Sequence, residues 1–308
     1  MRIVFMGTPE FAAASLRRLV EDGHEICGVF TQPDKPKNRG MKLVFPPVKE
    51  YALAQGLPVY QPESMKEKSA IELLHSLKPE LSVVAAYGQI LPEAALNAPT
   101  LGSINVHASL LPRYRGAAPI NWAILNGETE TGVTIMHMAK KLDAGDIITV
   151  RKTPIDPNED AEMLFARLAE LGAQLLSETI PLLCSGAATR TPQDDVLSTY
   201  APMLSRTLSP IDWNKPSRVI LDQIRGLIPW PVASTTLEGK TLKIYQAQPG
   251  GPTSEAPGRM RAVKAGIEAA CGDGQSILIT TLQPEGSKRM SAGAYLNGRR
   301  IASGSYLN

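Results

Sequence analysis

Asn105 and His107 stand two positions apart in the segment INVH, and their side-chain types suit a catalytic site. On an extended strand, side chains at positions i and i+2 point to the same side. An amide that donates hydrogen bonds would then lie beside an imidazole, whose ordinary pKa of about 6.5 suits proton transfer near neutral pH. Taken alone, a buried Asn–His pair on a strand is more often structural than catalytic.

The residues that follow this strand favour a site. A turn is predicted directly after it, and the loop 113–116 then leads into the apolar segment Ala117–Leu125. In open α/β sheets, ligands bind at the carboxyl ends of the strands. The pattern therefore predicts that the amide, the imidazole and exposed backbone N–H groups of the turn meet at one strand end. The predicted turn comprises Ser109, Leu110, Leu111 and Pro112.

The stretch INVHASLLPRYRGAAPI resembles the signature of the formyltransferases that use 10-formyltetrahydrofolate, and LDAGD, at residues 142–146, resembles their second signature. Those enzymes carry an Asn, a His and an Asp in this order, which match Asn105, His107 and Asp143. From the opening RIVFMGTPEF onward, nearly the whole chain is similar to the branch of this family that formylates methionyl-tRNA. The resemblance implies formyl transfer from 10-formyltetrahydrofolate to the amino group of initiator methionyl-tRNA, for translation initiation.

Such a transfer between two nitrogens needs a hydrogen-bond donor for a developing oxyanion and a group that moves protons near neutral pH. Asn105 can donate through its amide without changing charge. His107 can stabilise the oxyanion and relay protons. Asp143, which by itself would be interpreted as a turn residue before Gly145, can orient the imidazole or favour its protonated form. No covalent intermediate is required, and no nucleophile motif of the GxSxG type is present.

The resemblance also implies a folate site. It places the pterin ring against the turn after the apolar strand Leu81–Ala86, and it adds the turn Ser109–Pro112 to the same site. His137 lies in a strand pattern, TIMHM, which favours a structural role, and no clustered ligands indicate a metal. The residues expected to contact the folate from the first turn are Tyr87, Gly88, Gln89, Ile90 and Leu91.

Hydrophobic periodicity predicts alternating strands and helices over the first 188 residues, and hence a Rossmann-like, mainly parallel sheet with crossover helices. The first strand, Ile3–Met6, is followed by a single glycine rather than GxGxxG, which argues against dinucleotide binding. The further predicted strands are Ile26–Thr31, Leu57–Tyr60, Leu81–Ala86, Gly102–His107, Thr131–Met138 and Asp146–Thr153, and the predicted helices are Ala12–Val20, Lys66–Leu77 and Ala161–Leu183.

The connection Gln32–Pro47 is long for a compact α/β unit, and long loops of this kind are usually functional or disordered. Its cations could contact phosphates, and Arg39 offers a planar fork or a stacking surface. In the family that formylates tRNA, the matching loop enters the acceptor stem with an arginine at the position of Arg39. A solvated basic loop is the alternative interpretation. The cations concerned are Lys35, Lys37, Arg39 and Lys42.

The composition changes near residue 186, where Ala, Thr, Ser, Asp and Pro become frequent. We predict a catalytic domain over residues 1–188, a linker over 189–207 and a C-terminal domain over 208–308. The last of these holds 12 Lys+Arg against 7 Asp+Glu, whereas the rest of the chain holds 20 against 23. This charge suggests an anionic partner. Short strands with turn signals predict a small β-barrel, and the resemblance implies an OB-like fold that binds tRNA, with Arg206 in the linker.

Composition describes an ordinary soluble protein, with 43% hydrophobic and 20% charged residues. Three scattered cysteines and the absence of a signal-peptide pattern favour a cytoplasmic protein, and the family suggests a monomer. Two alternatives remain open. The same three residues could serve a formyltransferase acting on an amino sugar or glycinamide ribonucleotide, or a formyltetrahydrofolate hydrolase. The chain could also be an inactive α/β scaffold that binds RNA.

Overall fold

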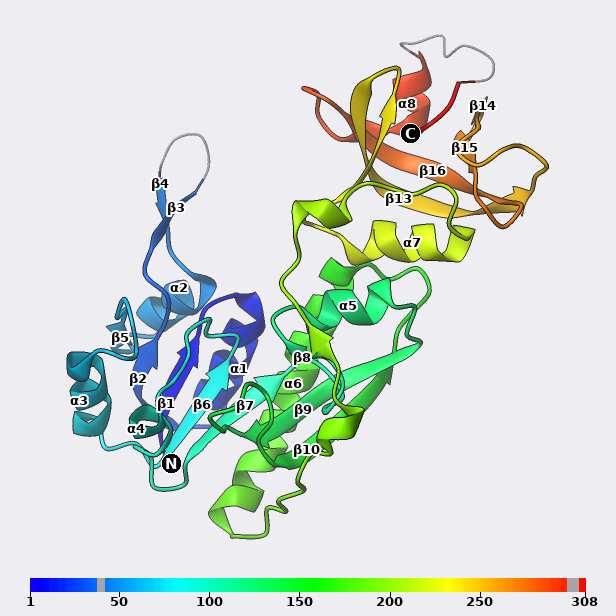
Figure 1. Cartoon of the computed structure of the whole chain (residues 1–308). Coiled ribbons are helices and arrows are strands. Elements are labelled where there is room, and N and C mark those ends of the chain that lie inside the picture. The colour runs from blue at the N-terminus through cyan, green and yellow to red at the C-terminus, as the bar shows by residue number, and fades with distance from the viewer. Residues whose placement is uncertain (38–41, 298–304) are drawn as a thin grey trace. The chain divides into compact units, whose positions relative to one another are not determined.

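A computed structural model describes residues 1–37, 42–297 and 305–308. Contacts between residues divide the chain into two units (Figure 1). The first unit comprises Met1–Pro119, Glu130–Pro154 and Phe165–Ala201, and the second comprises Ile120–Thr129, Ile155–Leu164 and Pro202–Asn308.

A seven-stranded sheet with the order β10-β9-β7-β6-β1-β2-β5 forms the centre of the first unit. The four pairs from β7 through β6, β1 and β2 to β5 are parallel, whereas β9 runs antiparallel to both β7 and β10. The predicted mainly parallel sheet is therefore confirmed. Its strands are β1 (Arg2–Gly7), β2 (Glu25–Phe30), β5 (Val59–Tyr60), β6 (Leu81–Ala85), β7 (Ser103–His107), β9 (Glu130–His137) and β10 (Ile147–Pro154).

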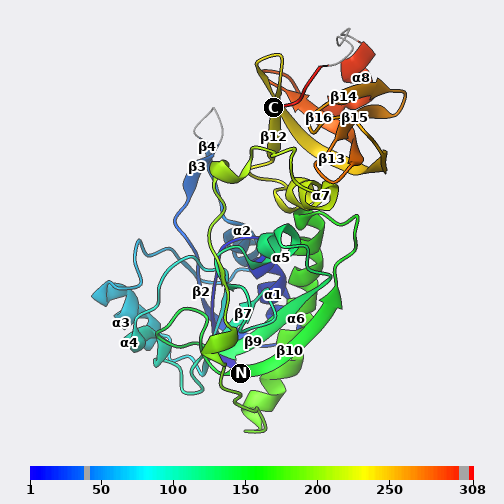
Figure 2. The same ribbon diagram turned by 45° about the vertical axis from the view of Figure 1, so that its right-hand side comes forward.

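Helices cover both faces of this sheet (Figure 2). On one face, Phe11 of α1 and Phe165 of α6 meet edge to face, and a Cβ on Gly172 of α6 would lie 3.0 Å from Val106 of β7. On the other face, residues of α3 and α4 share a buried cluster with Val4, Met6 and Val84. The helices are α1 (Glu10–Glu21), α2 (Pro47–Ala54), α3 (Lys68–Ser76), α4 (Glu93–Leu96) and α6 (Ala161–Cys184).

The central strands are buried on both faces, which explains their nearly continuous apolar sequence. In β1, all residues from Ile3 to Met6 are fully buried. The chain leaves α1 through Gly23 at φ 77°, a backbone conformation that a residue without a Cβ adopts readily. Sequence pattern and fold agree here because burial itself sets the pattern.

The long connection Gln32–Pro47 contains two short strands that the sequence did not predict. Strands β3 (Lys35–Lys37) and β4 (Lys42–Val44) pair antiparallel, with Lys35 opposite Val44 and Lys37 opposite Lys42. The hairpin projects from the body of the first unit (Figures 1 and 2). Helix α2 follows it, beginning at Pro47, where proline's fixed φ suits a first helical position.

The segment after α6 returns over the first unit. Thr191 forms a bridge with Ile147 of β10, and β11 (Tyr200–Ala201) pairs parallel with β8 (Arg115–Gly116). A short 3-10 turn, η1 (Asp195–Leu197), lies between these contacts. Part of the predicted linker is therefore attached to the first unit by backbone hydrogen bonds.

An antiparallel sheet in the order β12-β13-β16-β15-β14, with β17 paired to β16, forms the second unit. Among the described residues no strand pairing joins β12 to β14, so a closed OB-like barrel is not confirmed. The strands are β12 (Ala233–Leu237), β13 (Lys240–Pro252), β14 (Met260–Val263), β15 (Gly266–Ala270), β16 (Gln275–Pro284) and β17 (Met290–Ser291). The helical elements of this unit include α5 (Pro119–Leu125), η2 (Arg206–Leu208), α7 (Ser217–Gly226) and α8 (Ala292–Asn297).

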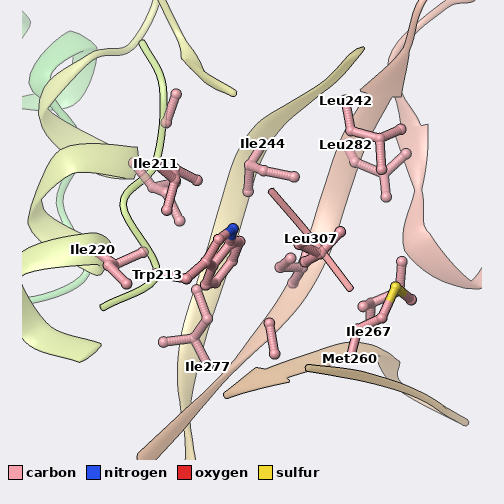
Figure 3. Packing of buried hydrophobic residues seen from close by; sticks show 14 of the residues in the cluster. Ile211, Trp213, Ile220, Leu242, Ile244, Met260, Ile267, Ile277, Leu282 and Leu307 are labelled. Carbon is pink, nitrogen blue, oxygen red and sulfur yellow. The ribbon is translucent and has the colours of Figure 1, made fainter. Parts of the chain in front are cut away.

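A buried apolar cluster holds this second sheet together (Figure 3). Trp213 lies within it and donates its indole N–H to Thr235 Oγ1 at 3.0 Å, so its polar atom is satisfied inside the core. Ile220 of α7 and Leu307 near the C-terminus also belong to the cluster.

None of the helices in the parts of the chain that the structure describes is both long and apolar enough to span a membrane.

Candidate active site

Strand β7 presents Asn105 and His107 on the sheet face opposite to Val106. Val106 packs towards α6, whereas Ser103, in phase with Asn105, donates its hydroxyl to Leu96 O of α4 at 2.9 Å. The relative exposure is 8% for Asn105 and 6% for His107. The period-two prediction from the sequence is confirmed because both residues lie within a regular strand.

His107 ends β7, and each of its ring nitrogens faces a different oxygen. Nε2 lies 2.9 Å from the carbonyl oxygen of Tyr114. A carbonyl can only accept, so Nε2 carries the hydrogen and donates it. Nδ1 lies 3.8 Å from Oδ2 of Asp143, which is longer than a direct hydrogen bond. The imidazole is thus anchored through Nε2, and Nδ1 is the nitrogen positioned to exchange a proton.

Asp143 reaches this position through an unusual backbone conformation. Its φ is 48°, in the left-handed region that a side chain with a Cβ disfavours. Its Oδ2 accepts a hydrogen bond of 2.8 Å from the backbone N–H of Gly116. Two residues further, a Cβ on Gly145 would lie 1.8 Å from the carbonyl oxygen of His137, so this position requires glycine. The structure therefore brings all three predicted residues of the site to one end of β7.

The side-chain amide of Asn105 has no hydrogen-bond partner within the described part of the chain. The amide is not among the fully buried side-chain atoms that lack a partner, so solvent reaches it although the residue is only 8% exposed. Beside the imidazole of His107, this amide is therefore free to form hydrogen bonds with water or with a bound molecule.

The turn after β7 is stabilised from within the protein. Thr134 Oγ1 of β9 donates to Ser109 O at 2.7 Å and accepts from Leu111 N at 3.2 Å. The N–H of Ser109 donates to His107 O, and Arg113 N donates to Leu110 O. The expectation of exposed backbone N–H groups at this turn is therefore wrong for Ser109 and Leu111. Their N–H groups stabilise the turn instead.

The second turn expected to contact the folate, Tyr87–Leu91, lies at the carboxyl end of the neighbouring parallel strand β6. Thr8 Oγ1 donates to Tyr87 O at 2.9 Å, so the turn also meets the end of β1. The Tyr87 ring is buried, which raises the pKa of its hydroxyl. Gln89 accepts a hydrogen bond from Met65 N through Oε1 and donates one to Pro62 O through Nε2. Gly88 and Ile90 are exposed, and Ile90 presents a large apolar side chain with 73% exposure.

The cations expected to contact tRNA lie in different parts of the chain. Lys35, Lys37 and Lys42 belong to the β3–β4 hairpin, and Arg206 begins η2 with an exposed side chain. Arg39 lies outside the described residues. At the base of the hairpin, Lys49 Nζ pairs with Asp34 Oδ2 at 2.5 Å, and hydrogen bonding to Lys49 lowers the pKa of Asp34.

Other contacts of the site were not predicted from the sequence. They are the carbonyl of Tyr114, the N–H of Gly116 and two side chains, Arg115 and Gln193. Arg115 donates through Nε and Nη2 to Gln193 Oε1 at 3.1 and 2.8 Å. These partners are 78 residues apart in the chain. Local sequence patterns contain no signal for such a pair.

The chain belongs to the formyl transferase family. The family's formyl transferase model matches residues 1–180, and its model of the formyl transferase C-terminal domain matches residues 203–300.

Relatives of similar length carry a more specific name. The protein named methionyl-tRNA formyltransferase from Geotalea uraniireducens is 50% identical, and the alignment covers 100% of this chain and 98% of that protein. The protein of the same name from Moorella thermoacetica is 52% identical, with coverage of 100% of this chain and 99% of that protein. The protein of that name from Bacillus subtilis is 48% identical over 99% and 97%. This chain is thus similar to these relatives from end to end.

Two solved structures show the same fold at low identity. One is the N-formyltransferase from Helicobacter canadensis in complex with folinic acid and dTDP-3-aminofucose, with a TM-score of 0.68, 20% identity, and coverage of 90% of this chain and 98% of that one. The other is HypX from Aquifex aeolicus in complex with tetrahydrofolic acid, with a TM-score of 0.65, 18% identity, and coverage of 99% and 51%.

Proposed function

We infer that this chain transfers the formyl group of 10-formyltetrahydrofolate to the free amino group of methionyl-tRNA, and that the initiator tRNA is its substrate. The inference is supported by the full-length similarity to proteins named methionyl-tRNA formyltransferase. The single structural observation that supports the chemistry is the juxtaposition of His107 Nδ1 and Asp143 Oδ2 beside the unpartnered amide of Asn105.

In this proposal, 10-formyltetrahydrofolate supplies an activated formyl group. Asn105 donates from its amide to the formyl oxygen, where negative charge develops during the transfer. The bond from the folate nitrogen to the formyl carbon breaks while the bond from the methionyl nitrogen forms. The methionyl nitrogen also gives up a proton, which must reach the folate nitrogen or solvent.

His107 moves that proton through Nδ1, because Nε2 is already bound to Tyr114 O. When Nδ1 takes up the proton, the imidazole becomes a cation that faces the carboxylate of Asp143. Attraction between the two charges stabilises this form in a site where both side chains are largely buried. Asp143 itself keeps its hydrogen bond from Gly116 N throughout.

We propose that the folate is held between the two turns at the ends of β6 and β7. The turn after β6 comprises Tyr87, Gly88, Gln89, Ile90 and Leu91, and the turn after β7 comprises Ser109, Leu110, Leu111 and Pro112. Adjacent parallel strands end at the same edge of a sheet, which is where ligands bind in open α/β sheets. The buried, internally bonded side chains of these turns provide a rigid frame, and the exposed Ile90 provides apolar surface.

We further propose that tRNA binds the β3–β4 hairpin, with Lys35, Lys37, Arg39 and Lys42, together with Arg206 and a basic domain over residues 208–308. This domain is proposed to be OB-like. Two isolated bridges support this proposal. Leu307 pairs with Leu237 of β12, and Tyr306 pairs with Arg259, next to β14, so the C-terminal residues join the two edges of the sheet. We also propose that the catalytic domain ends at residue 188 and that the C-terminal domain begins at residue 208.

The test is formyl incorporation from 10-formyltetrahydrofolate into methionyl initiator tRNA, with a parallel reaction that lacks tRNA and measures release of formate. Transfer that requires charged tRNA is the expected result. Tetrahydrofolate formed without tRNA would instead indicate a hydrolase. An amino sugar nucleotide as the preferred acceptor would replace methionyl-tRNA as the substrate but leave the roles of Asn105 and His107 intact.

A further inference from the structure

The loop that carries Asp143 is held by a side chain from the segment after α6. Gln193 Nε2 donates to the carbonyl oxygen of Asp143 at 2.9 Å and to that of Gly145 at 2.7 Å. One amide group thus binds the loop on both sides of residue 144. Gln193 is 50 residues from Asp143 in the chain, so this contact exists only in the folded protein.

The orientation of the Gln193 amide is fixed by Arg115. Its Oε1 accepts from Nε and Nη2 of Arg115, while Nη1 of the same guanidinium pairs with Asp195 Oδ1 at 2.7 Å. The Arg115 side chain is only 7% exposed. Because a guanidinium can only donate, Oε1 must face it, and Nε2 must face the two carbonyls.

These contacts close a ring around Asp143. Gly116, whose N–H donates to the Asp143 carboxylate, directly follows Arg115, whose side chain holds Gln193. The carboxylate and the carbonyl of Asp143 are therefore both tied to the same short strand, β8. Such a ring explains how Asp143 is kept in left-handed backbone, because strained conformations persist where the surroundings hold them.

We propose that Gln193 is a positioning residue for formyl transfer: it fixes the Asp143 loop so that the carboxylate faces His107 Nδ1, and it influences the reaction through Asp143. This inference rests on the proposed function and extends it. It assigns a role in the chemistry to the connecting segment, which the sequence marked only as a linker.

Two substitutions at this position separate the bonds of Gln193. Gln193→Met keeps the length of the side chain and removes all of its strong hydrogen bonds. Gln193→Glu keeps acceptors for Arg115 but places a carboxylate oxygen against two carbonyls. If donation to the loop is what matters, both variants should lower kcat roughly ten- to a hundred-fold, with the KM of each substrate nearly unchanged. Normal kcat in Gln193→Glu would overturn the proposal.

The action through Asp143 is tested by combining substitutions. In an Asp143→Ala background, Gln193→Met should change kcat by less than about twofold, because the residue that Gln193 positions is absent. A residue that merely stabilises the fold would lower kcat by the same factor in both backgrounds, and that result would contradict the inference.

Gln283 offers a matched control. It is also partly buried, donates to a carbonyl, Ser287 O, at 2.8 Å, and accepts from the hydroxyl of Tyr245 at 2.9 Å. Gln283→Met therefore removes one donated and one accepted hydrogen bond in the second unit. Because kcat is measured at saturating methionyl-tRNA, it does not report on tRNA affinity of the domain over residues 208–308, and it should stay at the wild-type value. A loss in this variant equal to that in Gln193→Met would mean that any lost glutamine contact lowers activity, and would overturn the inference.

A measurement without turnover distinguishes failure of this inference from failure of the proposed function. Hydrogen exchange at the Gly116 amide of the full-length protein, free of substrates, reports the hydrogen bond to Asp143. It should be faster in Gln193→Met than in wild type and unchanged in Gln283→Met. Unchanged exchange in Gln193→Met would overturn the inference even if wild type forms formylmethionyl-tRNA. Faster exchange would support positioning of Asp143 even if the natural acceptor is another amine.

Discussion

His107 and Asp143 face each other across 3.8 Å, between Nδ1 of the ring and Oδ2 of the carboxylate. The same Oδ2 accepts a hydrogen bond from Gly116 N, and the opposite ring nitrogen of His107 donates to Tyr114 O. Both groups are thus fixed by the backbone of one loop, Tyr114–Gly116. At this distance the carboxylate acts on the imidazole through its charge, which counts for more in a largely buried site than in water.

Replacement of His107 should abolish most of the chemistry and spare substrate binding. His107→Ala should lower kcat by about 10²- to 10⁴-fold, because general acid–base groups contribute on that scale. Binding of methionyl-tRNA should remain close to the wild-type level in a filter-binding or fluorescence titration. His75→Ala, on the exposed face of α3, is the control and should retain full activity. Equal kcat in the two variants would contradict the assignment of His107.

Asn105 should contribute through its hydrogen-bond donor. Asn105→Asp keeps the size of the side chain but loses the donor and adds negative charge where an oxyanion develops. We expect kcat to fall by about 10²- to 10³-fold, as for other groups that stabilise an oxyanion. Single-turnover kinetics separate this effect from substrate binding. Full activity of Asn105→Asp would show that the amide is not the donor.

Arg39 should affect tRNA and leave folate unaffected. In Arg39→Ala we expect lower kcat/KM for methionyl-tRNA, an unchanged KM for 10-formyltetrahydrofolate, and a salt dependence of tRNA binding that is weaker by about one phosphate contact. Lys68→Ala removes one surface cation from α3, where the side chain is 90% exposed, and serves as the control. If both variants use tRNA like wild type, the basic hairpin is a solvated surface feature.

His137 predicts a dependence of stability on pH. Burial lowers the pKa of His137, the charge of Arg190 lowers it further, and Asp146 opposes the shift. Above a pH of about 6.5 the imidazole is neutral in both states. Below it, the unfolded chain binds the proton first, so the free energy of unfolding falls as pH falls.

His137→Gln removes this titration. Urea unfolding at pH 8 and at pH 5.5 should therefore show a smaller loss of stability in the variant than in wild type. The difference between the two proteins should appear at the lower pH and vanish at the higher one, once the constant effect of the substitution is subtracted. An identical pH dependence in both proteins would contradict the expected contribution of His137.

Local sequence pattern predicted the elements whose pattern arises from burial. The helix at Glu10–Glu21 and the strands at Arg2–Gly7 and Ser103–His107 lie within a few residues of their predicted bounds. The hairpin β3–β4 was not predicted, because Lys35–Lys37 and Lys42–Val44 pair mainly through backbone hydrogen bonds and lack the alternation of a half-buried strand. Helix α2 was not predicted because its short segment begins at the second of two consecutive prolines, Pro46 and Pro47, which also suit a loop.

The sequence by itself determined the sheet class, the placement of Asn105 and His107 on one side of a strand, and the family, because these depend on local periodicity and contiguous signatures. Only the tertiary structure decided the surroundings of Asp143. The Gly116 N–H holds its carboxylate from 27 residues away, and the Gln193 amide holds its loop from 50 residues away. Together these contacts keep its backbone in the left-handed region. Such contacts form when the chain folds back on itself, and no local pattern of side chains encodes them.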